Sequence, residues 1–308
     1  MKKITLAFFL ALYATGVWSW QPKKDIEVVV GFPPGGSTDL IARVMADGFN
    51  RHGLKTIVSN RPGAGGAIAA RQVIDSKGDR YVIMITGTAF LFNHLLKSPA
   101  ANYDPVSALD HLLLIGTVEN HIYANSTTVV GDIKKVLTDI KNQTRKYTIG
   151  VTNPGAEFTA KLIEHNLGVP LNLVKYTGSS QAAADLLGGH IDMVIDSGSG
   201  MLSRLPDATR VRLIATLNPR NTDDRATVDA VLAGVSSNSW FGMSLPPGSP
   251  PDVLQFYRDL MIKTILDPKT QAALKDIGLV ISGRKDLQQV ITEDLTRFKP
   301  IAANVTRP

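Results

Sequence analysis

The chain has 308 residues, of which 44% are hydrophobic and 19% are charged, so it can fold around a substantial core. It contains no cysteine, which excludes disulfide bonds, cysteine-ligated zinc, iron–sulfur clusters and a thiol nucleophile. The formal net charge is +6, but the basic residues are scattered and aromatic residues do not interleave with them, which argues against nucleic-acid binding.

Residues 1–19 have the layout of a secretory signal peptide. Lys2 and Lys3 precede a mostly apolar run over 4–17, and small or polar residues follow it. This run is shorter than the ~20 residues that a membrane-spanning helix needs. We therefore expect cleavage after Ser19 and export of a chain that does not span the membrane. An uncleaved N-terminal anchor is the alternative.

A glycine-rich turn follows the first predicted strand. The apolar run 26–31 predicts a buried strand, residues 31–39 (GFPPGGSTD) form the turn, and an amphipathic helix is expected from about Thr38 to His52. The start of a helix leaves several backbone amides without intrahelical partners, and the helix dipole adds positive potential there. The turn therefore predicts a site for an anion such as a carboxylate.

The remaining elements continue this alternation of strands and helices. The first unit is completed by a strand at 56–59, a second glycine-rich turn at 60–66, a helix at 67–76 and a strand at 81–86. A second unit is predicted from helices at 132–142, 157–167 and 181–187 and strands at 147–151, 171–174, 191–196 and 211–216. Three C-terminal helices, at 252–266, 270–277 and 287–298, are expected to pack back on the first unit.

This order of elements predicts an α/β fold with mainly parallel sheets in two lobes. Segments near 117–123 and 235–240 separate the two units. We expect lobe 1 to comprise residues 20–120 and 239–308, and lobe 2 residues 121–238. Two lobes joined by more than one crossing form a cleft between them and can hinge.

Five short motifs resemble those of the Bug-type extracytoplasmic solute receptors of tripartite tricarboxylate transporters. They occur in the family's order across roughly residues 25–300, which makes the set far more specific than any one of them. The motifs are residues 28–39, residues 60–66 (NRPGAGG), residues 103–105 (YDP), residues 176–178 with 185–192, and residues 240–242 with 246–250.

The resemblance implies a two-domain periplasmic-binding-protein (Venus flytrap) fold, type II-like, with a ligand cleft between the lobes. It implies a periplasmic receptor, not an enzyme, that captures a tricarboxylate, dicarboxylate, acidic amino acid or aromatic acid. The receptor would deliver this small carboxylate to the membrane permease subunits of a tripartite tricarboxylate transporter. No cofactor and no metal are expected, since the six histidines show no metal-binding spacing.

The resemblance also carries ligand-binding positions onto two loops. The first-lobe loop supplies Phe32, Pro34, Gly35, Gly36, Ser37, Thr38 and Asp39. Ser37 or Thr38 could instead cap the helix. The second-lobe loop supplies Thr152, Asn153, Gly155 and Ala156, but it departs from the family pattern at Pro154 and Glu157. Glu157 either complements the helix dipole, which we favour, or places a carboxylate in the cleft.

A third group of polar residues lies at the ends of other predicted strands, where ligands gather in open α/β sheets. Asp196 could bind a ligand hydroxyl or amine, or it could cap a following turn. Ser197 follows it, Tyr176 and Thr177 are candidates at the same rim, and Thr86 and Thr88 are weaker candidates in the first lobe.

Two other functions stay open at this point. An exported α/β hydrolase would need a nucleophile with its base or a metal set, and no such motif is visible; Ser199, for example, lies in Gly-Ser-Gly and not in a G-x-S-x-G elbow. A receptor that feeds a sensor kinase would use the same closure as a transport receptor, so the residues do not separate these two.

Overall fold

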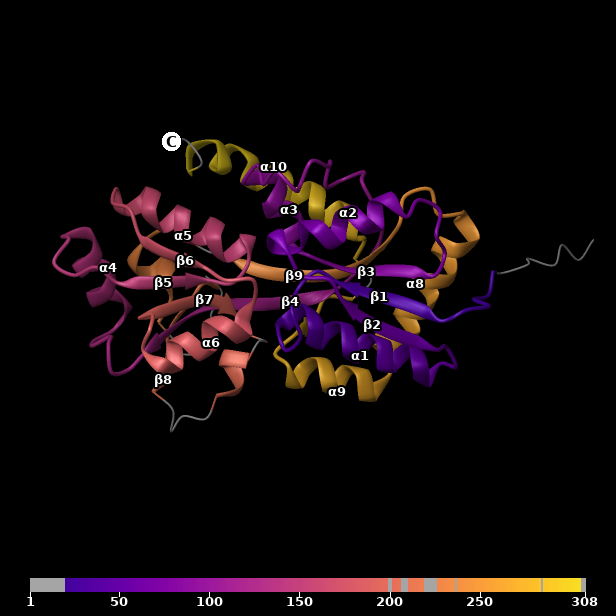
Figure 1. Cartoon of the computed structure of the whole chain (residues 1–308), viewed down its shortest axis with the longest axis horizontal. Coiled ribbons are helices and arrows are strands. Elements are labelled where there is room, and N and C mark those ends of the chain that lie inside the picture. Colours follow the sequence, from indigo (N-terminus) through magenta and orange to yellow (C-terminus); the bar gives the residue numbers. More distant parts are fainter. Residues whose placement is uncertain are drawn as a thin grey trace, which may run out of the picture.

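The computed structural model describes residues 20–198, 201–205, 210–218, 226–235, 237–283 and 285–305. The expected signal peptide and Ser199 lie outside the described residues. Two groups of elements form the two lobes of the molecule, on the right and left of Figure 1. Each lobe has its own buried core, one around Val28, Ile41 and Met243 and one around Ile149, Ile163 and Ile195.

Lobe 1 begins with the predicted βαβαβ series. Its elements are β1 (Ile26–Val30), α1 (Ser37–Arg51), β2 (Thr56–Asn60), the 3-10 turn η1 (Ala64–Gly66), α2 (Ala67–Asp75), β3 (Val82–Gly87) and α3 (Thr88–Leu95). β1 pairs in parallel with β2 and β3. Successive residues of β1 point to opposite faces, so Val28 packs toward α1 and Val29 toward α2. Both faces are covered by helices, which explains why the consecutive residues Val28, Val29 and Val30 are all apolar and buried.

Two long antiparallel strands join the lobes. β4 (Asp110–Asn125) pairs with β9 (Asn238–Leu245) in lobe 1 and with β7 (Met193–Ser197) and β8 (Val211–Thr216) in lobe 2. With β5 (Thr148–Val151) and β6 (Asn172–Lys175), the strands follow the order β2-β1-β3-β9-β4-β7-β5-β6 in one sheet that runs through the molecule (Figure 1). The two segments predicted to separate the units therefore lie in or beside strands that cross between them.

Lobe 2 repeats the architecture of lobe 1. It contains α4 (Ile133–Lys141), β5 (Thr148–Val151), α5 (Pro154–Leu167), β6 (Asn172–Lys175), α6 (Ser179–Gly188), β7 (Met193–Ser197), the 3-10 turn η2 (Met201–Arg204), β8 (Val211–Thr216) and α7 (Val228–Val231). β5 pairs in parallel with β6 and β7. α5 begins three residues before its predicted start, because Pro154 occupies the first helical position and the Asn153 side chain accepts the Ala156 amide at 3.1 Å.

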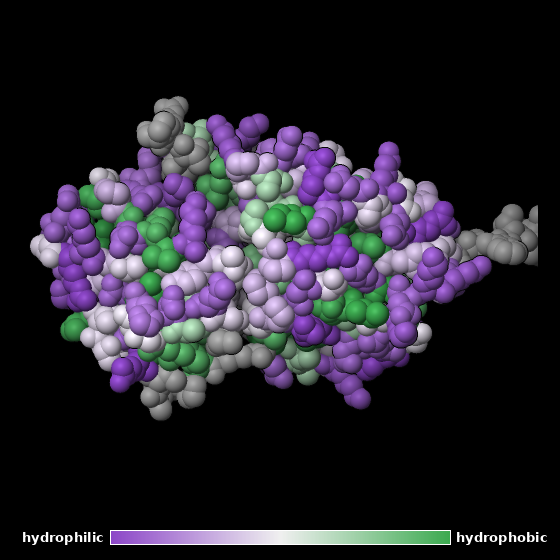
Figure 2. All heavy atoms as spheres, in the orientation of Figure 1, coloured by the Kyte–Doolittle hydropathy of each residue, from purple (hydrophilic) through white to green (hydrophobic). Residues whose placement is uncertain are grey.

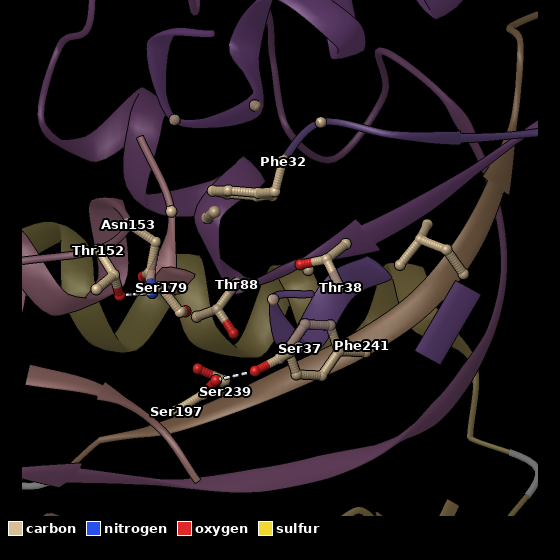
Figure 3. A pocket seen from close by; sticks show the side chains of 18 of the residues that line it. Phe32, Ser37, Thr38, Thr88, Thr152, Asn153, Ser179, Ser197, Ser239 and Phe241 are labelled. Atoms are coloured by element: carbon tan, nitrogen blue, oxygen red, sulfur yellow. Dashed lines mark hydrogen bonds between the residues drawn. The ribbon is translucent and has the colours of Figure 1, made fainter. Parts of the chain in front are cut away.

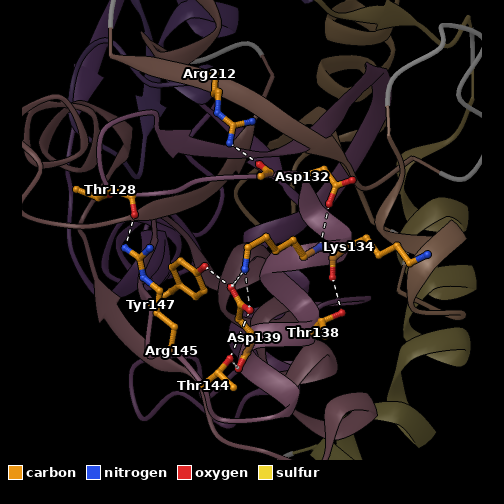
Figure 4. A network of polar contacts seen from close by, with 11 residues as sticks. Thr128, Asp132, Lys134, Thr138, Asp139, Thr144, Arg145, Tyr147 and Arg212 are labelled. Carbon is orange, nitrogen blue, oxygen red and sulfur yellow. Dashed lines mark hydrogen bonds and ion pairs between the residues drawn. The ribbon is translucent and has the colours of Figure 1, made fainter.

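A polar network ties together the outer end of lobe 2 (Figure 4). Asp139 accepts hydrogen bonds from Lys135 Nζ at 2.8 Å and from Tyr147 Oη at 2.9 Å. Arg145 lies over the Tyr147 ring, 4.6 Å from its centroid, and donates to the backbone oxygen of Thr128. These contacts join α4 to the strand that follows it, far from the junction of the lobes.

The C-terminal helices differ in what they cover. They are α8 (Pro251–Leu266), α9 (Pro268–Asp276) and α10 (Leu287–Val305), with the short strand β10 (Val280–Ile281) before the last one. α8 and α9 pack against α1, as predicted. α10 extends past its predicted end at Phe298, and Ile301 reaches the core of lobe 2. Among the described residues, no helix has the length and apolar character needed to span a bilayer.

Candidate functional site

A cavity of about 60 Å³ lies between the two lobes. It has room for only a few water molecules, so a larger ligand can enter only when the lobes move apart. Its walls combine serine and threonine hydroxyls with the aromatic rings of Phe32, Phe90 and Phe241. Figure 3 shows the labelled hydroxyls and rings around this cavity. On the outer face of the molecule that Figure 2 shows, most residues of both lobes are hydrophilic.

Five helices begin at this cavity, and four of them have glycine at the N-cap. The glycines are Gly36 before α1, Gly66 before α2, Gly87 before α3 and Gly178 before α6. Glycine has no side-chain oxygen to accept the first helical amides, and none of these four ends has a side-chain cap. Of the five helices that begin at the cavity, only α5 has a side-chain cap, which Asn153 provides. The cavity wall is therefore rich in amide donors and in the positive ends of helix dipoles.

The start of α1 shows this most directly. Within the described part of the chain, the amides of Ser37 and Thr38 have no protein acceptor. Neither Ser37 nor Thr38 caps the helix, because Gly36 occupies the N-cap position. These amides are the donors that the glycine-rich turn predicts.

Asp39 holds the glycine-rich loop before α1 (the α1 loop, residues 31–36) in place through hydrogen bonds. Its carboxylate accepts the Gly35 amide at 3.0 Å, Asn60 Nδ2 at 2.8 Å and Arg43 Nε at 2.9 Å. Burial alone would raise the pKa of Asp39, but these hydrogen bonds outweigh it and hold the pKa below its usual value. Gly35 has a φ of +86°, which an L-residue rarely adopts. Asp39 therefore positions the loop and does not line the cavity.

The lobes touch directly across the cavity. The hydroxyls of Ser37 in α1 and Ser197 in β7 point toward one another and form a hydrogen bond (Figure 3). Ser180 Oγ in α6 donates to the backbone oxygen of Pro34 at 3.2 Å. A Cβ atom on Gly65 would overlap the Pro154 ring of the opposite lobe. The structure is thus a closed arrangement of the two lobes.

Asp196 is the one ionisable side chain among the described residues that line the cavity. It is 1% exposed, and its Oδ1 accepts hydrogen bonds from Thr152 Oγ1 at 2.6 Å and Ser179 Oγ at 2.9 Å. Burial raises the pKa of Asp196 to about 6, although these two hydroxyls oppose the shift. Asp196 lies within β7, opposite His121 of β4, so it does not cap a turn.

The structure brings together many of the residues singled out in the sequence. The predicted residues that line the cavity are Phe32, Gly36, Ser37, Thr38, Thr88, Thr152, Asn153, Asp196 and Ser197.

The other predicted residues lie outside the lining, each for a local reason. Thr86 is fully buried and donates to Ser244 Oγ at 2.7 Å. Tyr176 Oη is bound to Asp185 at 2.7 Å, and Thr177 Oγ1 to Gln181 at 2.9 Å. Residues placed in the two loops but behind the cavity wall are Pro34, Gly35, Asp39, Gly155 and Ala156.

Glu157 also lies outside the cavity. It stands in the first turn of α5 and accepts a hydrogen bond from Lys175 Nζ at 2.7 Å. This is the arrangement expected of a residue that complements a helix dipole.

Several lining residues were not proposed from the sequence. They are Gly31, Gly65, Gly66, Met84, Ile85, Phe90, Gly178, Ser179, Ser180, Ser239 and Phe241, whereas Pro33, Gly87 and Ala89 lie within the segments 32–39 and 86–89 from which candidates were drawn. One signal was available for some of them, because Gly66 and Gly178 repeat the pattern of a glycine directly before a helix. Ser239 and Phe241 carry no such signal and reach the cavity because β9 crosses between the lobes.

Comparison with known proteins adds a family to this geometry. The family model described as "Tripartite tricarboxylate transporter family receptor" matches residues 41–306. A protein encoded in the tcbD–tcbE intergenic region of a Pseudomonas species is 27% identical over 270 residues, covering 85% of this chain and 80% of the relative. Protein BugT of Bordetella pertussis is 26% identical over 240 residues, covering 76% of this chain and 74% of the relative.

Solved structures share the fold. The periplasmic binding protein BugD superposes with a TM-score of 0.85 at 24% identity, covering 92% of this chain and 98% of BugD. Two proteins of Rhodopseudomonas palustris give TM-scores of 0.84 and 0.83 at 20% and 23% identity, and each match covers 92% of this chain. These matches cover 100% and 98% of the two proteins, whose structures contain malate and adipate respectively.

Proposed function

The chain belongs to the tripartite tricarboxylate transporter receptor family, and from this premise we propose that it captures a small carboxylate in the cleft and delivers it to a membrane permease. The proposed ligand is a tricarboxylate, a dicarboxylate, an acidic amino acid or an aromatic acid. The observation that carries this proposal is the convergence of glycine-capped helix N-termini on one cavity.

The binding mechanism follows from these helix ends. A carboxylate that enters the cleft exchanges its water for main-chain amides, and each helix N-terminus contributes roughly half a positive charge. Closure of the lobes excludes water, which strengthens these hydrogen bonds. Three charge-assisted bonds at about 1.5–3 kcal/mol each are comparable to the about 8 kcal/mol of a micromolar complex, before the entropic cost of binding.

The structural relatives support the ligand class. The two R. palustris proteins hold dicarboxylates, and they share the two-lobed fold. This chain also matches the family model over the segments that form both walls of the cavity, apart from the first-lobe turn before residue 41. Malate and adipate are therefore suitable first probes.

A binding screen tests the proposal. The mature protein is titrated by calorimetry and thermal shift with malate, succinate, adipate, citrate, glutamate and benzoate. At least one carboxylate should raise the melting temperature and bind with a measurable enthalpy. Hydrolysis of a generic ester together with a flat carboxylate screen would contradict the proposal and favour the exported hydrolase.

Export and delivery are further parts of the proposal. We expect mature protein to begin at Trp20 and to be recovered from the periplasm, which N-terminal sequencing of that fraction checks. The lobes are proposed to comprise residues 20–120 with 239–308 and residues 121–238, in keeping with the two separate cores. Uptake of the bound ligand by cells that express the receptor with its permease would distinguish transport from a role in feeding a sensor kinase.

A further inference from the structure

The buried carboxylate of Asp196 is an unusual feature for a cleft that binds anions. Among the described residues that line the cavity, Asp196 has the one ionisable side chain, and it lies among helix N-termini that favour negative ligands. A carboxylate ligand placed beside it would be repelled at neutral pH unless a hydrogen-bond donor lies between the two groups.

The protein's two hydroxyl donors both bind one oxygen of this carboxylate, and the backbone amide of Ser197 also interacts with the group. Oδ1 accepts both hydroxyls, from Thr152 in one loop and Ser179 at the start of α6. Oδ2 is buried and has no hydrogen-bond partner. An unpaired buried oxygen of an ionised group is costly, so a purely structural role is a poor explanation for it. An asparagine could accept the same two hydroxyls without carrying a charge.

The free oxygen lies close to the expected carboxylate site. Ser197, the next residue, touches Ser37 at the beginning of α1, and Ser179 is both a donor to Asp196 and the first residue of α6. A ligand whose carboxylate binds at these helix ends occupies the same cavity that Asp196 lines. A donor on the carbon next to this carboxylate can bind the free oxygen.

We infer that Asp196 Oδ2 accepts a hydrogen bond from a hydroxyl or ammonium group next to the ligand carboxylate, so that the receptor selects 2-hydroxy or 2-amino acids over their unsubstituted analogues. This inference rests on the proposed function and narrows its ligand class. It assigns Asp196 as a specificity-determining residue.

Matched ligands test the inference on the unmodified protein. Calorimetric titrations compare succinate with malate and aspartate, glutarate with 2-hydroxyglutarate and glutamate, and propionate with lactate and alanine. In the series that binds, a donor-bearing member should bind at least about tenfold more tightly than the unsubstituted acid, because the latter leaves the buried oxygen unpaired. The hydroxyl and amine members show which donor is preferred.

Two variants then locate the effect. Asp196→Asn should lose the preference for donor-bearing ligands while still binding the unsubstituted acid. Asp185→Asn is the matched control, because Asp185 lies in the same lobe, accepts a hydrogen bond from Tyr176 and does not line the cavity. This control should keep the wild-type preference.

The outcomes separate the two proposals. If no carboxylate of any series binds the wild type, the proposed function fails and this inference fails with it. If carboxylates bind but the matched members bind equally, or if Asp196→Asn keeps the preference, the inference alone is overturned. The matched-ligand titrations use the unmodified protein, so they still decide the inference if Asp196→Asn does not fold.

Discussion

Two adjacent glycines in the α1 loop serve different needs. Gly35 has a positive φ and donates its amide to Asp39, so its conformation is required by the loop itself. Gly36 has an ordinary φ of −80°, and a Cβ placed there would come no closer than 3.9 Å to its nearest neighbours, Pro33 and Ser179. The backbone tolerates a side chain at Gly36, but the cavity does not.

We therefore predict that Gly36→Leu weakens carboxylate binding at least about tenfold with little change in stability, because the side chain occupies the cavity. Gly35→Ala should instead destabilise the protein by about 1–2 kcal/mol, since alanine is strained at that φ. Calorimetry and urea denaturation of both variants check this pair. Unchanged affinity in Gly36→Leu would show that the ligand binds elsewhere.

Asp196 also makes stability depend on pH in an unusual direction. Burial raises its pKa to about 6, so the folded protein retains a proton that the unfolded chain has released. The contribution of Asp196 to stability is fully present below its unfolded pKa of about 4 and is lost as the pH rises through 6. Between pH 4 and pH 6, the titration of Asp196 lowers the unfolding free energy by about 3 kcal/mol.

The unfolding free energy of wild type relative to Asp196→Asn should therefore fall by about 3 kcal/mol between pH 4 and pH 8. Urea titrations of the two proteins across this range measure the difference, which cancels the titration of all other groups. Asp185→Asn provides the control for loss of a charge. A difference that stays constant with pH would mean that the Asp196 carboxylate is not held in the low-dielectric interior.

The sequence identified the polar residues of the site better than their roles. Ser37 and Asn153 lie in turns just before predicted helices, and Asp196 lies at the end of a predicted strand. All three line the cavity. Their partners could not be read in the same way, because Ser37 meets Ser197 across 160 positions of the chain. Asp39 was predicted to bind ligand, because its hydrogen bond with Asn60, 21 positions away, forms only in the folded loop.

At the scale of elements, local periodicity identified most helices and strands but missed α3, the long strands β4 and β9, and the short elements α7 and β10. α3 is apolar on most of its surface, since Leu91 and Phe92 are buried together with Phe90 among other helices. It therefore lacks the amphipathic pattern that marks α1. β4 is buried along nearly its whole length where it crosses between the lobes, so no alternation marks it.

An aromatic cluster connects elements of both lobes. Phe92 of α3 lies 4.5 Å from Phe158 of α5 between ring centroids, and Phe298 of α10 lies 5.2 Å and 5.6 Å from these two rings. All three side chains are buried. The cluster makes α10 part of the junction between the lobes and not only a cover for lobe 1.

We predict that Phe158→Ala lowers the unfolding free energy by about 3–5 kcal/mol, because it leaves a cavity where three elements meet. A double-mutant cycle with Phe158→Leu and Phe298→Leu should give a coupling of about 0.5–1.5 kcal/mol. Equilibrium urea denaturation of wild type, Phe158→Ala and the three leucine variants of the cycle measures both quantities. Strict additivity would indicate that α10 and α5 do not share a packed interface in solution.

At the scale of the whole molecule, the direct contact between Ser37 and Ser197 implies that ligand exchange requires the lobes to separate. The cavity of about 60 Å³ has no room for a dicarboxylate to pass while this contact persists. Because the chain has no cysteine, a pair of engineered cysteines can report on this contact without competing thiols.

The double variant Ser37→Cys/Ser197→Cys should form a disulfide under mild oxidation, since the two side-chain oxygens already touch across the cavity. The oxidised protein should then exchange carboxylate ligands far more slowly than the reduced one, and a reductant should restore exchange. Stopped-flow binding measures the rates, and each single cysteine variant serves as a control that cannot cross-link within one molecule. If the cross-linked protein binds ligand as fast as the protein with free thiols does, the entry route lies outside the cleft. If the two cysteines do not cross-link, the lobes rest apart in solution.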